Sequence, residues 1–288
     1  MKQIDFMGIR PYAYVISVIL VFVSLFSLYW NGLNLGLDFT GGTVIEVKYS
    51  PKIDIAKIRS SLMDVGLSSV QVQDTASGTL LVKLKVGEPK EKAISVLKKL
   101  GNAQLISMQS IGGVISDELR RKALWSLLVA IGGILLYLGY RFEPIWSFSG
   151  IVALVHDVLV VLGAYSLTQK EINLDVVASF LIVAGYSVSD TVVVFDRIRE
   201  NLRIRKATNL KQVINLSINQ TLSRTLMTSL TVFVVAFTLF LLGGPALSDI
   251  MFAFVVGIAV GTLSSIFVAS ALMLDIKERI FKAGLQRA

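Results

Sequence analysis

Two charged side chains inside long apolar stretches are the residues with the clearest capacity for chemistry. Asp190 lies in an apolar segment over 180–195, and Arg224 lies in another over 221–233. A charge within a membrane-spanning helix costs about 3 kcal/mol, so it usually faces the interior of a bundle and marks an ion pathway. A carboxylate can take up and release a proton, whereas a guanidinium stays charged. We therefore predict a proton-coupled function.

Helical spacing places further polar side chains beside these two charges. Ser187, Asp190 and Thr191 share one helix face because residues three and four apart are neighbours. Arg224 and Thr228 lie on one polar stripe of the next apolar segment. Both charges lie a few residues from the segment that joins the two helices, so we predict a contact between them. A static buried ion pair that only stabilises packing is the alternative interpretation.

A second polar pair lies near the middle of the third apolar run. His156 is the only histidine in the chain, and Asp157 follows it directly. Histidine can exchange a proton near neutral pH, and a neighbouring carboxylate would make the pair a proton relay. The alternative is a hydrogen-bonded pair that only supports the structure.

Composition indicates the elements that must hold these residues. The chain of 288 residues is 54% hydrophobic and 17% charged, against about 25% charged residues in a soluble domain. A helix needs about 20 apolar residues to cross a membrane. We therefore predict a polytopic α-helical membrane protein with six spans. The six apolar runs lie at 11–33, 118–140, 146–168, 172–196, 219–243 and 247–275.

The basic residues indicate how these spans are oriented. The net charge is +8, and the positive side chains gather next to helix ends within 2–10, 141, 197–211 and 277–287. With six spans these groups all fall on one side, which the positive-inside rule assigns to the cytoplasm. We expect both termini in the cytoplasm, a retained first span and no nucleic-acid partner. The polar stretch 197–218 predicts a longer loop with a short helix.

The polar segment between the first two spans has the pattern of a small α+β domain. Asp54 and Pro89 each begin a predicted helix. The resulting order βαββαβ is that of a ferredoxin-like unit, which serves either as a spacer or as a binding domain. The predicted strands cover 43–49, 70–74, 79–86 and 103–111. The predicted divisions are 1–33 (first span), 34–115 (this domain), 116–275 (remaining spans) and 276–288 (basic cytoplasmic tail).

The last span carries small residues at every fourth position, including Gly257 and Gly261. Such a stripe allows close packing between helices in lipid.

Motifs for chemical catalysis are missing from the sequence. It has no phosphate-binding loop, no zincin motif and no nucleophile elbow, and it contains no cysteine. We therefore expect no enzymatic activity, no catalytic residue, no metal and no cofactor, with protons as the coupling ion. A membrane potential supplies about 2.3 kcal/mol per charge per 100 mV.

Four motifs resemble the SecD/SecF family of protein-export membrane proteins. The segment 36–43, with Gly36, Asp38, Gly41 and Gly42, resembles the signature that follows the first helix in the SecD and SecF branches. Three further segments resemble the third-, fourth- and fifth-helix motifs of the SecF branch. They are 155–157, 185–201 and 219–228.

This resemblance implies a fold and a role. The fold is that of the resistance–nodulation–division superfamily, in which each of two subunits supplies six helices. The role is assistance to protein export, driven by the proton-motive force, in the bacterial cytoplasmic (inner) membrane. By the matching motifs, Asp190 and Arg224 occupy positions of proton passage. The implied partners are a separate SecD, the SecYEG channel, YajC, YidC, the translocating polypeptide and membrane lipids.

Two other functions are compatible with the residues. The chain could be half of a proton-coupled exporter of lipids or small molecules with the same superfamily fold. It could also be a passive scaffold for a translocase partner.

Overall fold

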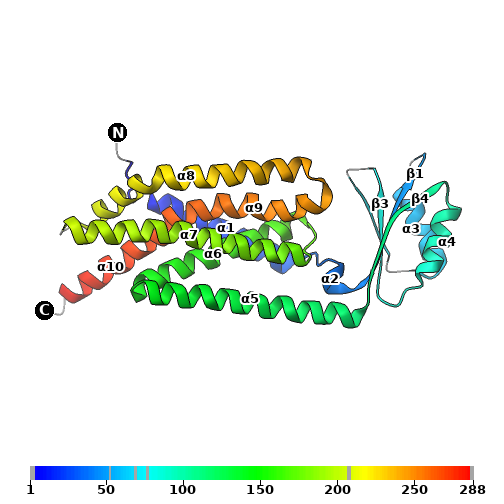
Figure 1. Cartoon of the computed structure of the whole chain (residues 1–288), viewed down its shortest axis with the longest axis horizontal. Coiled ribbons are helices and arrows are strands. Elements are labelled where there is room, and N and C mark those ends of the chain that lie inside the picture. Colours follow the sequence, from blue (N-terminus) through cyan, green and yellow to red (C-terminus); the bar gives the residue numbers. More distant parts are fainter. Residues whose placement is uncertain (1–3, 52, 68–69, 76–77, 206–208, 286–288) are drawn as a thin grey trace. The chain divides into compact units, whose positions relative to one another are not determined.

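The computed structural model describes residues 4–51, 53–67, 70–75, 78–205 and 209–285. The elements form two compact units, one built from 1–34 and 126–288 and the other from 35–125. Within the described residues, six helical stretches are long and apolar enough to cross a membrane (Figure 1). The predicted polytopic membrane fold is confirmed.

The spans are nearly continuous helices. The last one contains a π-helical turn, η1, which separates α9 from α10. Helix α5 begins within the second unit and ends in the first. The helices are α1 (Arg10–Trp30), α5 (Gly113–Arg141), α6 (Pro144–Thr168), α7 (Leu174–Arg205), α8 (Leu210–Leu242), α9 (Gly244–Ser264), η1 (Ser265–Ala269) and α10 (Ser270–Leu285).

The prediction of a long polar loop with its own short helix over 197–218 is wrong. Helix α7 continues to Arg205 and α8 begins at Leu210, and 206–208 lie outside the described residues. The polar side chains of this stretch pair with each other across the two helices. Asn201 donates to Ser217 Oγ at 2.8 Å and to Gln220 Oε1 at 2.8 Å. These bonds satisfy polar groups that would otherwise favour a loop.

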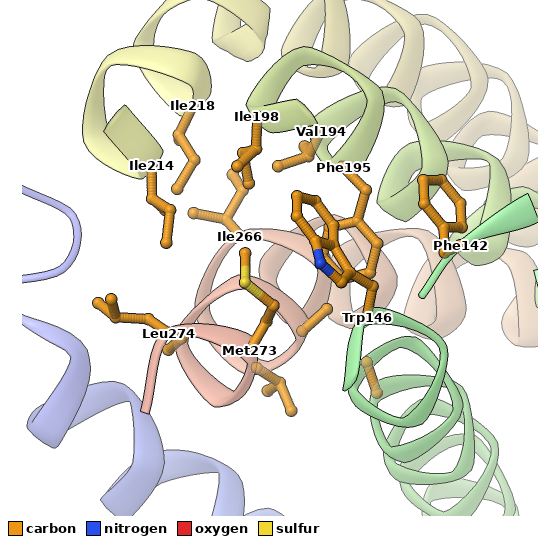
Figure 2. Close-up of a cluster of buried hydrophobic side chains, with 14 of the residues drawn as sticks. Phe142, Trp146, Val194, Phe195, Ile198, Ile214, Ile218, Ile266, Met273 and Leu274 are labelled. Atoms are coloured by element: carbon orange, nitrogen blue, oxygen red, sulfur yellow. The ribbon is translucent and has the colours of Figure 1, made fainter. Parts of the chain in front are cut away.

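An apolar core closes one end of the bundle, where α6, α7, α8 and the last span meet. The ring of Phe195 packs edge-on against Trp146, with centroids 5.3 Å apart, and against Phe142, with centroids 5.5 Å apart. Figure 2 shows Ile214, Ile218, Ile266, Met273 and Leu274 around the same cluster. Residues Val194, Phe195 and Ile198 of α7 are buried here. This core therefore fixes the rotation of α7 one turn away from Asp190.

The predicted close packing at the small residues of the last span is confirmed. A Cβ atom on Gly257 would lie 2.1 Å from Val183 Cγ1, and one on Gly261 would lie 3.1 Å from Ser187 Cβ. Both glycines therefore bring α9 against α7, the helix that carries Asp190.

The second unit is the predicted ferredoxin-like domain. Its sheet is antiparallel with the strand order β2-β3-β1-β4. Asp54 Oδ1 accepts a hydrogen bond from the Ala56 N–H at 3.1 Å, as expected of a helix cap. The side chains of Ile45, Ile58 and Leu62 form part of its core. The elements are α2 (Leu37–Thr40), β1 (Gly42–Tyr49), α3 (Ile55–Asp64), β2 (Gln71–Asp74), β3 (Leu80–Leu84), α4 (Lys90–Lys99) and β4 (Ala103–Ile111).

Strand β4 lies at an edge of this sheet and carries a β-bulge at Ile106, opposite Glu46 and Val47. It has nine residues, and none of them is charged or a proline. Leu105, Ile106 and Met108 are all more than 40% exposed. Edge strands of soluble domains are usually short, charged or covered, because bare edges pair with other chains.

Candidate functional site

Helices α7, α8 and α9 pack together (Figure 1). Asp190 belongs to α7. The Asp190 carboxyl is buried, with 7% of the residue exposed. The Ser229 hydroxyl donates to Asp190 Oδ2 at 3.4 Å, and the Thr262 hydroxyl donates to Ser229 Oγ at 2.8 Å. The carboxyl group of Asp190 therefore lies among hydroxyl groups.

The predicted contact between Asp190 and Arg224 does not form. In the part of the chain that the structure describes, no ion pair or hydrogen bond joins these two side chains. Asp190 lies beside Ser229, which follows Arg224 by five residues, so Arg224 is displaced by about 7.5 Å along the helix axis. Arg224 also lies on the exposed face of α8. Counting residues from the end of each helix predicted a similar depth for Asp190 and Arg224. It did not determine the rotation of α8 about its own axis.

The other predicted polar residues divide between the interior and the surface. Ser187, Asp190 and Thr191 are buried on one face of α7, as predicted. Thr228 is exposed, and its hydroxyl donates back to the Arg224 carbonyl at 3.0 Å. Thr228 therefore takes no part in the buried arrangement.

Asp157 connects three helices. Its Oδ1 lies 2.9 Å from His156 Nδ1 within α6, as the adjacency of the two residues suggested. Its Oδ2 accepts hydrogen bonds from Ser187 of α7 at 2.5 Å and from Ser264 of α9 at 2.7 Å. Only 2% of Asp157 is exposed. Three side chains thus contact the carboxyl group of Asp157, one at Oδ1 and two at Oδ2.

The two carboxyl groups belong to one polar layer. Ser187, which donates to Asp157, lies one turn from Asp190 on α7. The Ser265 hydroxyl lies 2.9 Å from Thr191 Oγ1 and 3.4 Å from the Ser187 carbonyl oxygen. Ser265 is also the first residue of η1, and π-helical turns often occur at functional sites.

A buried column of hydroxyl groups on α8 was missed by the sequence analysis. The hydroxyl-bearing residues of this column are spaced by four, so they lie on one face of α8. A search of the sequence for serine and threonine at this spacing would have found them. Ser217 and Ser229 are twelve residues apart, which corresponds to about 18 Å of helix. The buried Thr225 Oγ1 has no hydrogen-bond partner among the described residues. The column consists of Ser217, Thr221, Thr225 and Ser229.

This arrangement can bind and release a proton. Within the described residues no ion pair or hydrogen bond joins a cation to the Asp190 carboxyl, which accepts a hydrogen bond from Ser229 and experiences the charge of Arg224 from beyond contact distance. No cluster of three potential metal ligands occurs in the described ranges. Proton uptake and release by the buried carboxyl group of Asp190 is a chemistry that this arrangement supports.

The glycine-rich motif forms the connection between α2 and β1. Gly41 and Gly42 join α2 to β1 with φ values of +64° and +120°, and Gly36 and Asp38 lie at the start of α2.

Asn219 of the fifth-helix motif holds the main chain before α1. Its Oδ1 accepts from the Ile4 N–H at 3.0 Å, and its Nδ2 donates to the Ile4 carbonyl at 2.9 Å.

The same N-terminal segment carries a carboxylate with an altered pKa. The amide of Asn215 donates to Asp5 Oδ1 at 2.6 Å, and this hydrogen bond lowers the pKa of Asp5 below its ordinary value. Asp5 thus helps to attach the segment to α8.

Comparison with known families gives two matches. Residues 92–279 match the family described as "Protein export membrane protein SecD/SecF, C-terminal". Residues 26–53 match the "SecD/SecF GG Motif". The second range contains the Gly41–Gly42 turn.

Curated relatives are similar over nearly the whole chain. The protein translocase subunit SecF of Calditerrivibrio nitroreducens is 40% identical over 289 residues, which cover 96% of this chain and 95% of the relative. The corresponding protein of Pseudomonas aeruginosa is 38% identical over 277 residues, with coverage of 94% and 90%.

Two solved structures share the fold. The crystal structure of SecDF from Thermus thermophilus matches with a TM-score of 0.88 at 36% identity, covering 96% of this chain and 39% of that chain. SecDF in its super-membrane-facing form matches with a TM-score of 0.76 at 35% identity, covering 100% and 40%. The chain thus spans about two fifths of each solved SecDF chain.

Proposed function

Since the chain belongs to the SecD/SecF family of protein export membrane proteins, we propose that it is an auxiliary subunit of the Sec translocase of the SecF type. With a separate SecD, it uses the proton-motive force to promote late steps of protein export through SecYEG. The observation that carries this proposal is Asp190, a buried carboxyl group within a membrane span that accepts a hydrogen bond from the Ser229 hydroxyl.

Proton binding at Asp190 is the proposed coupling step. An ionised carboxylate in a membrane span costs about 3 kcal/mol, and one proton crossing 100 mV supplies about 2.3 kcal/mol. These magnitudes are similar, so the charge state of one carboxyl group can bias the packing of its helix. Neutral Asp190 interacts more weakly with the hydroxyl of Ser229, which favours a shift of α7 against α8. Gly257 and Gly261 line the opposite contact of α7, where the side chains of Val183 and Ser187 pack directly against the two glycines.

His156 and Asp157 form a proposed second position on the proton pathway. The hydrogen bond from Ser187 to Asp157 connects this pair to the helix face that carries Asp190. The buried column on α8 is the proposed route between Asp190 and the end of the bundle at Ser217.

Arg224 has a different proposed role. It stays protonated at any accessible pH, and it lies on the exposed face of α8 with Thr228 and Thr231. An arginine that faced lipid would be unfavourable, so we assign this polar stripe to contact with SecD. The fused SecDF of Thermus thermophilus supports such a pairing. The match covers 39% of that fused chain.

We also propose a location and further partners for the chain. The proposed location is the bacterial inner membrane, with both termini in the cytoplasm and the ferredoxin-like domain on the opposite side. YajC, YidC and the emerging polypeptide are further proposed partners.

Strand β4 provides a testable contact with SecD. A bare, uncharged edge strand can pair with a strand of another chain through main-chain hydrogen bonds. Ile106→Lys places a charge on this edge, where charged side chains discourage pairing. We expect recovery of SecD by affinity purification to fall at least tenfold. Met63→Lys is the matched control, because Met63 is similarly exposed but lies on α3. Equal recovery with both variants would contradict the contact.

Reconstitution tests the function as a whole. Proteoliposomes with SecYEG and SecD are prepared with and without the chain, and export of a secretory protein is measured with the proton gradient imposed or collapsed. We expect the chain to increase export only when the gradient is present. An increase that does not depend on the gradient would indicate a passive scaffold instead.

A further inference from the structure

The hydroxyl group of Ser229 on α8 connects three helices beside Asp190. It donates to Asp190 Oδ2 of α7 at 3.4 Å. It accepts hydrogen bonds from the Thr262 hydroxyl of α9 at 2.8 Å and from the Tyr186 hydroxyl of α7 at 3.4 Å. A serine hydroxyl offers one donor hydrogen and two acceptor lone pairs. These three contacts therefore use the hydrogen-bonding capacity of Ser229 completely.

The bond from Ser229 to Asp190 depends on the direction of one hydroxyl hydrogen. Its length of 3.4 Å exceeds the distance of about 2.5–3.0 Å that is usual for O–H···O bonds. A hydroxyl hydrogen turns about its C–O bond to suit its neighbours, so a long bond is kept only when another group fixes that direction. Thr262 is the closer of the two donors to Ser229, and only 7% of it is exposed. Because the Thr262 hydrogen points at Ser229 Oγ, the hydrogen of Ser229 is directed toward Asp190.

Thr262 has one hydroxyl hydrogen and two acceptors within reach. Besides Ser229 Oγ, the Ile258 carbonyl oxygen on the preceding turn of α9 lies 2.8 Å from Thr262 Oγ1. Threonine hydroxyls inside helices commonly bond to the carbonyl four residues earlier. The hydrogen is directed at one of these acceptors at a time. Thr262 therefore has two hydrogen-bonding arrangements that need no movement of the backbone.

We propose that Thr262 is a positioning residue, which sets the direction of a hydroxyl relay (Thr262, Ser229 and Asp190) according to the charge of Asp190. When Asp190 is ionised, Thr262 donates to Ser229, and Ser229 donates to Asp190. When Asp190 has bound a proton, its carboxyl group donates to Ser229, and Ser229 donates to Thr262. Thr262 then donates to the Ile258 carbonyl. Each hydroxyl hydrogen stays on its own oxygen and only turns about a C–O bond.

Both arrangements leave every hydroxyl group of the relay with a partner. A buried donor or acceptor without a partner is unfavourable, and a membrane span has no water to replace one. Tyr186 keeps its bond to Ser229 in both arrangements, because the second lone pair of Ser229 Oγ remains available. Arg224 acts on Asp190 from beyond contact distance and stays charged in both. The change of charge at Asp190 is therefore compensated by the two hydroxyl groups.

Infrared spectroscopy measures the relay directly. The full-length protein in lipid nanodiscs is compared at an acidic and an alkaline pH, and the bands of protonated and ionised Asp190 are assigned by their loss in Asp190→Asn. Thr262→Val keeps the shape of the side chain and removes the hydroxyl group. We expect this variant to shift both bands, because Thr262 contributes to both arrangements. A shift of one band alone, or of neither, would overturn the proposal.

Two further variants separate the hydroxyl group from the shape of the site. Thr262→Ser keeps the hydroxyl group and loses a methyl group, so both bands are expected at their original positions. Thr238→Val makes the same change as Thr262→Val on the exposed face of α8, where the Thr238 hydroxyl donates to the Val234 carbonyl of its own helix at 2.8 Å. Both bands are expected to stay in place there as well. Shifts in either control equal to those in Thr262→Val would overturn the proposal.

Export separates this inference from the function on which it rests. Because the relay acts through the proposed proton uptake at Asp190, gradient-stimulated export is measured in proteoliposomes with SecYEG and SecD. Thr262→Val is expected to lower this stimulation by about tenfold, the effect of one hydrogen bond to a charged group, whereas Thr262→Ser retains it. Unchanged stimulation in Asp190→Asn would refute the proposed function alone, because the infrared bands test the relay without transport. Unchanged stimulation in Thr262→Val, with loss in Asp190→Asn, would overturn the positioning role of Thr262.

Discussion

Replacing Asp190 with asparagine is expected to abolish the stimulation of export by the proton gradient while leaving the helical bundle assembled. The amide has the size of the carboxyl group and still accepts a hydrogen bond from Ser229. It cannot take up a proton, so the step that would move α7 against α8 is lost. Export in reconstituted proteoliposomes should fall to the level measured with the gradient collapsed.

The matched control for this variant lies on the same helix. Asp196 pairs with Arg141 at 2.6 Å, and the side chains of both are more than one third exposed. Exposed ion pairs contribute little, about 0–1 kcal/mol, so Asp196→Asn should retain stimulation by the gradient. Undiminished stimulation in Asp190→Asn would sink the proposed role of Asp190.

Comparison with Asp157 separates the two positions of the proposed pathway. Asp157→Asn preserves an acceptor for Ser187 and Ser264. If only Asp157→Asn loses stimulation, the proton pathway runs through the His156–Asp157 pair. Loss in both variants is the result expected from a shared polar layer.

Replacing Gly42 with alanine is expected to destabilise the ferredoxin-like domain by about 3 kcal/mol or more, because backbone strain and a steric clash act together. Gly42 has φ +120°, and a Cβ atom there would lie 2.2 Å from the Leu84 carbonyl oxygen. Leu84 is the partner of Thr43 in the pairing of β3 with β1. Relief of this clash requires the two central strands to separate. The effect is measured by thermal unfolding of the full-length protein. Cleavage of the ferredoxin-like domain by a protease is used to monitor its unfolding.

Gly66 is the control that isolates the steric clash from backbone strain. It has φ +88° in the same domain, but a Cβ atom there would meet nothing within 4 Å. Gly66→Ala should therefore lower stability by only about 1–2 kcal/mol. Equal melting temperatures for the two variants would show that the approach of Leu84 does not explain the Gly41–Gly42 motif.

Local sequence patterns were sufficient for the elements themselves. The six spans follow from apolar length, because a helix must cover a fixed hydrocarbon thickness. The strand over 43–49 and the cap at Asp54 follow from alternation and from side-chain chemistry, which act within a few residues. The buried face with Ser187, Asp190 and Thr191 follows from helical periodicity. The family motifs led to the same fold by resemblance.

The partners of the charged residues were decided only by tertiary structure. Periodicity places residues on one helix relative to each other, but it contains no information on the rotation or axial offset of a neighbouring helix. In this protein α7 extends to Arg205, and its pairing with α8 brings Asp190 to Ser229 and leaves Arg224 on the outer face. The convergence of Ser187 and Ser264 on Asp157 depends in the same way on Gly261, whose lack of a side chain lets α9 approach α7. Side-chain packing between helices sets these offsets, because the interior is close-packed and admits few alternative arrangements.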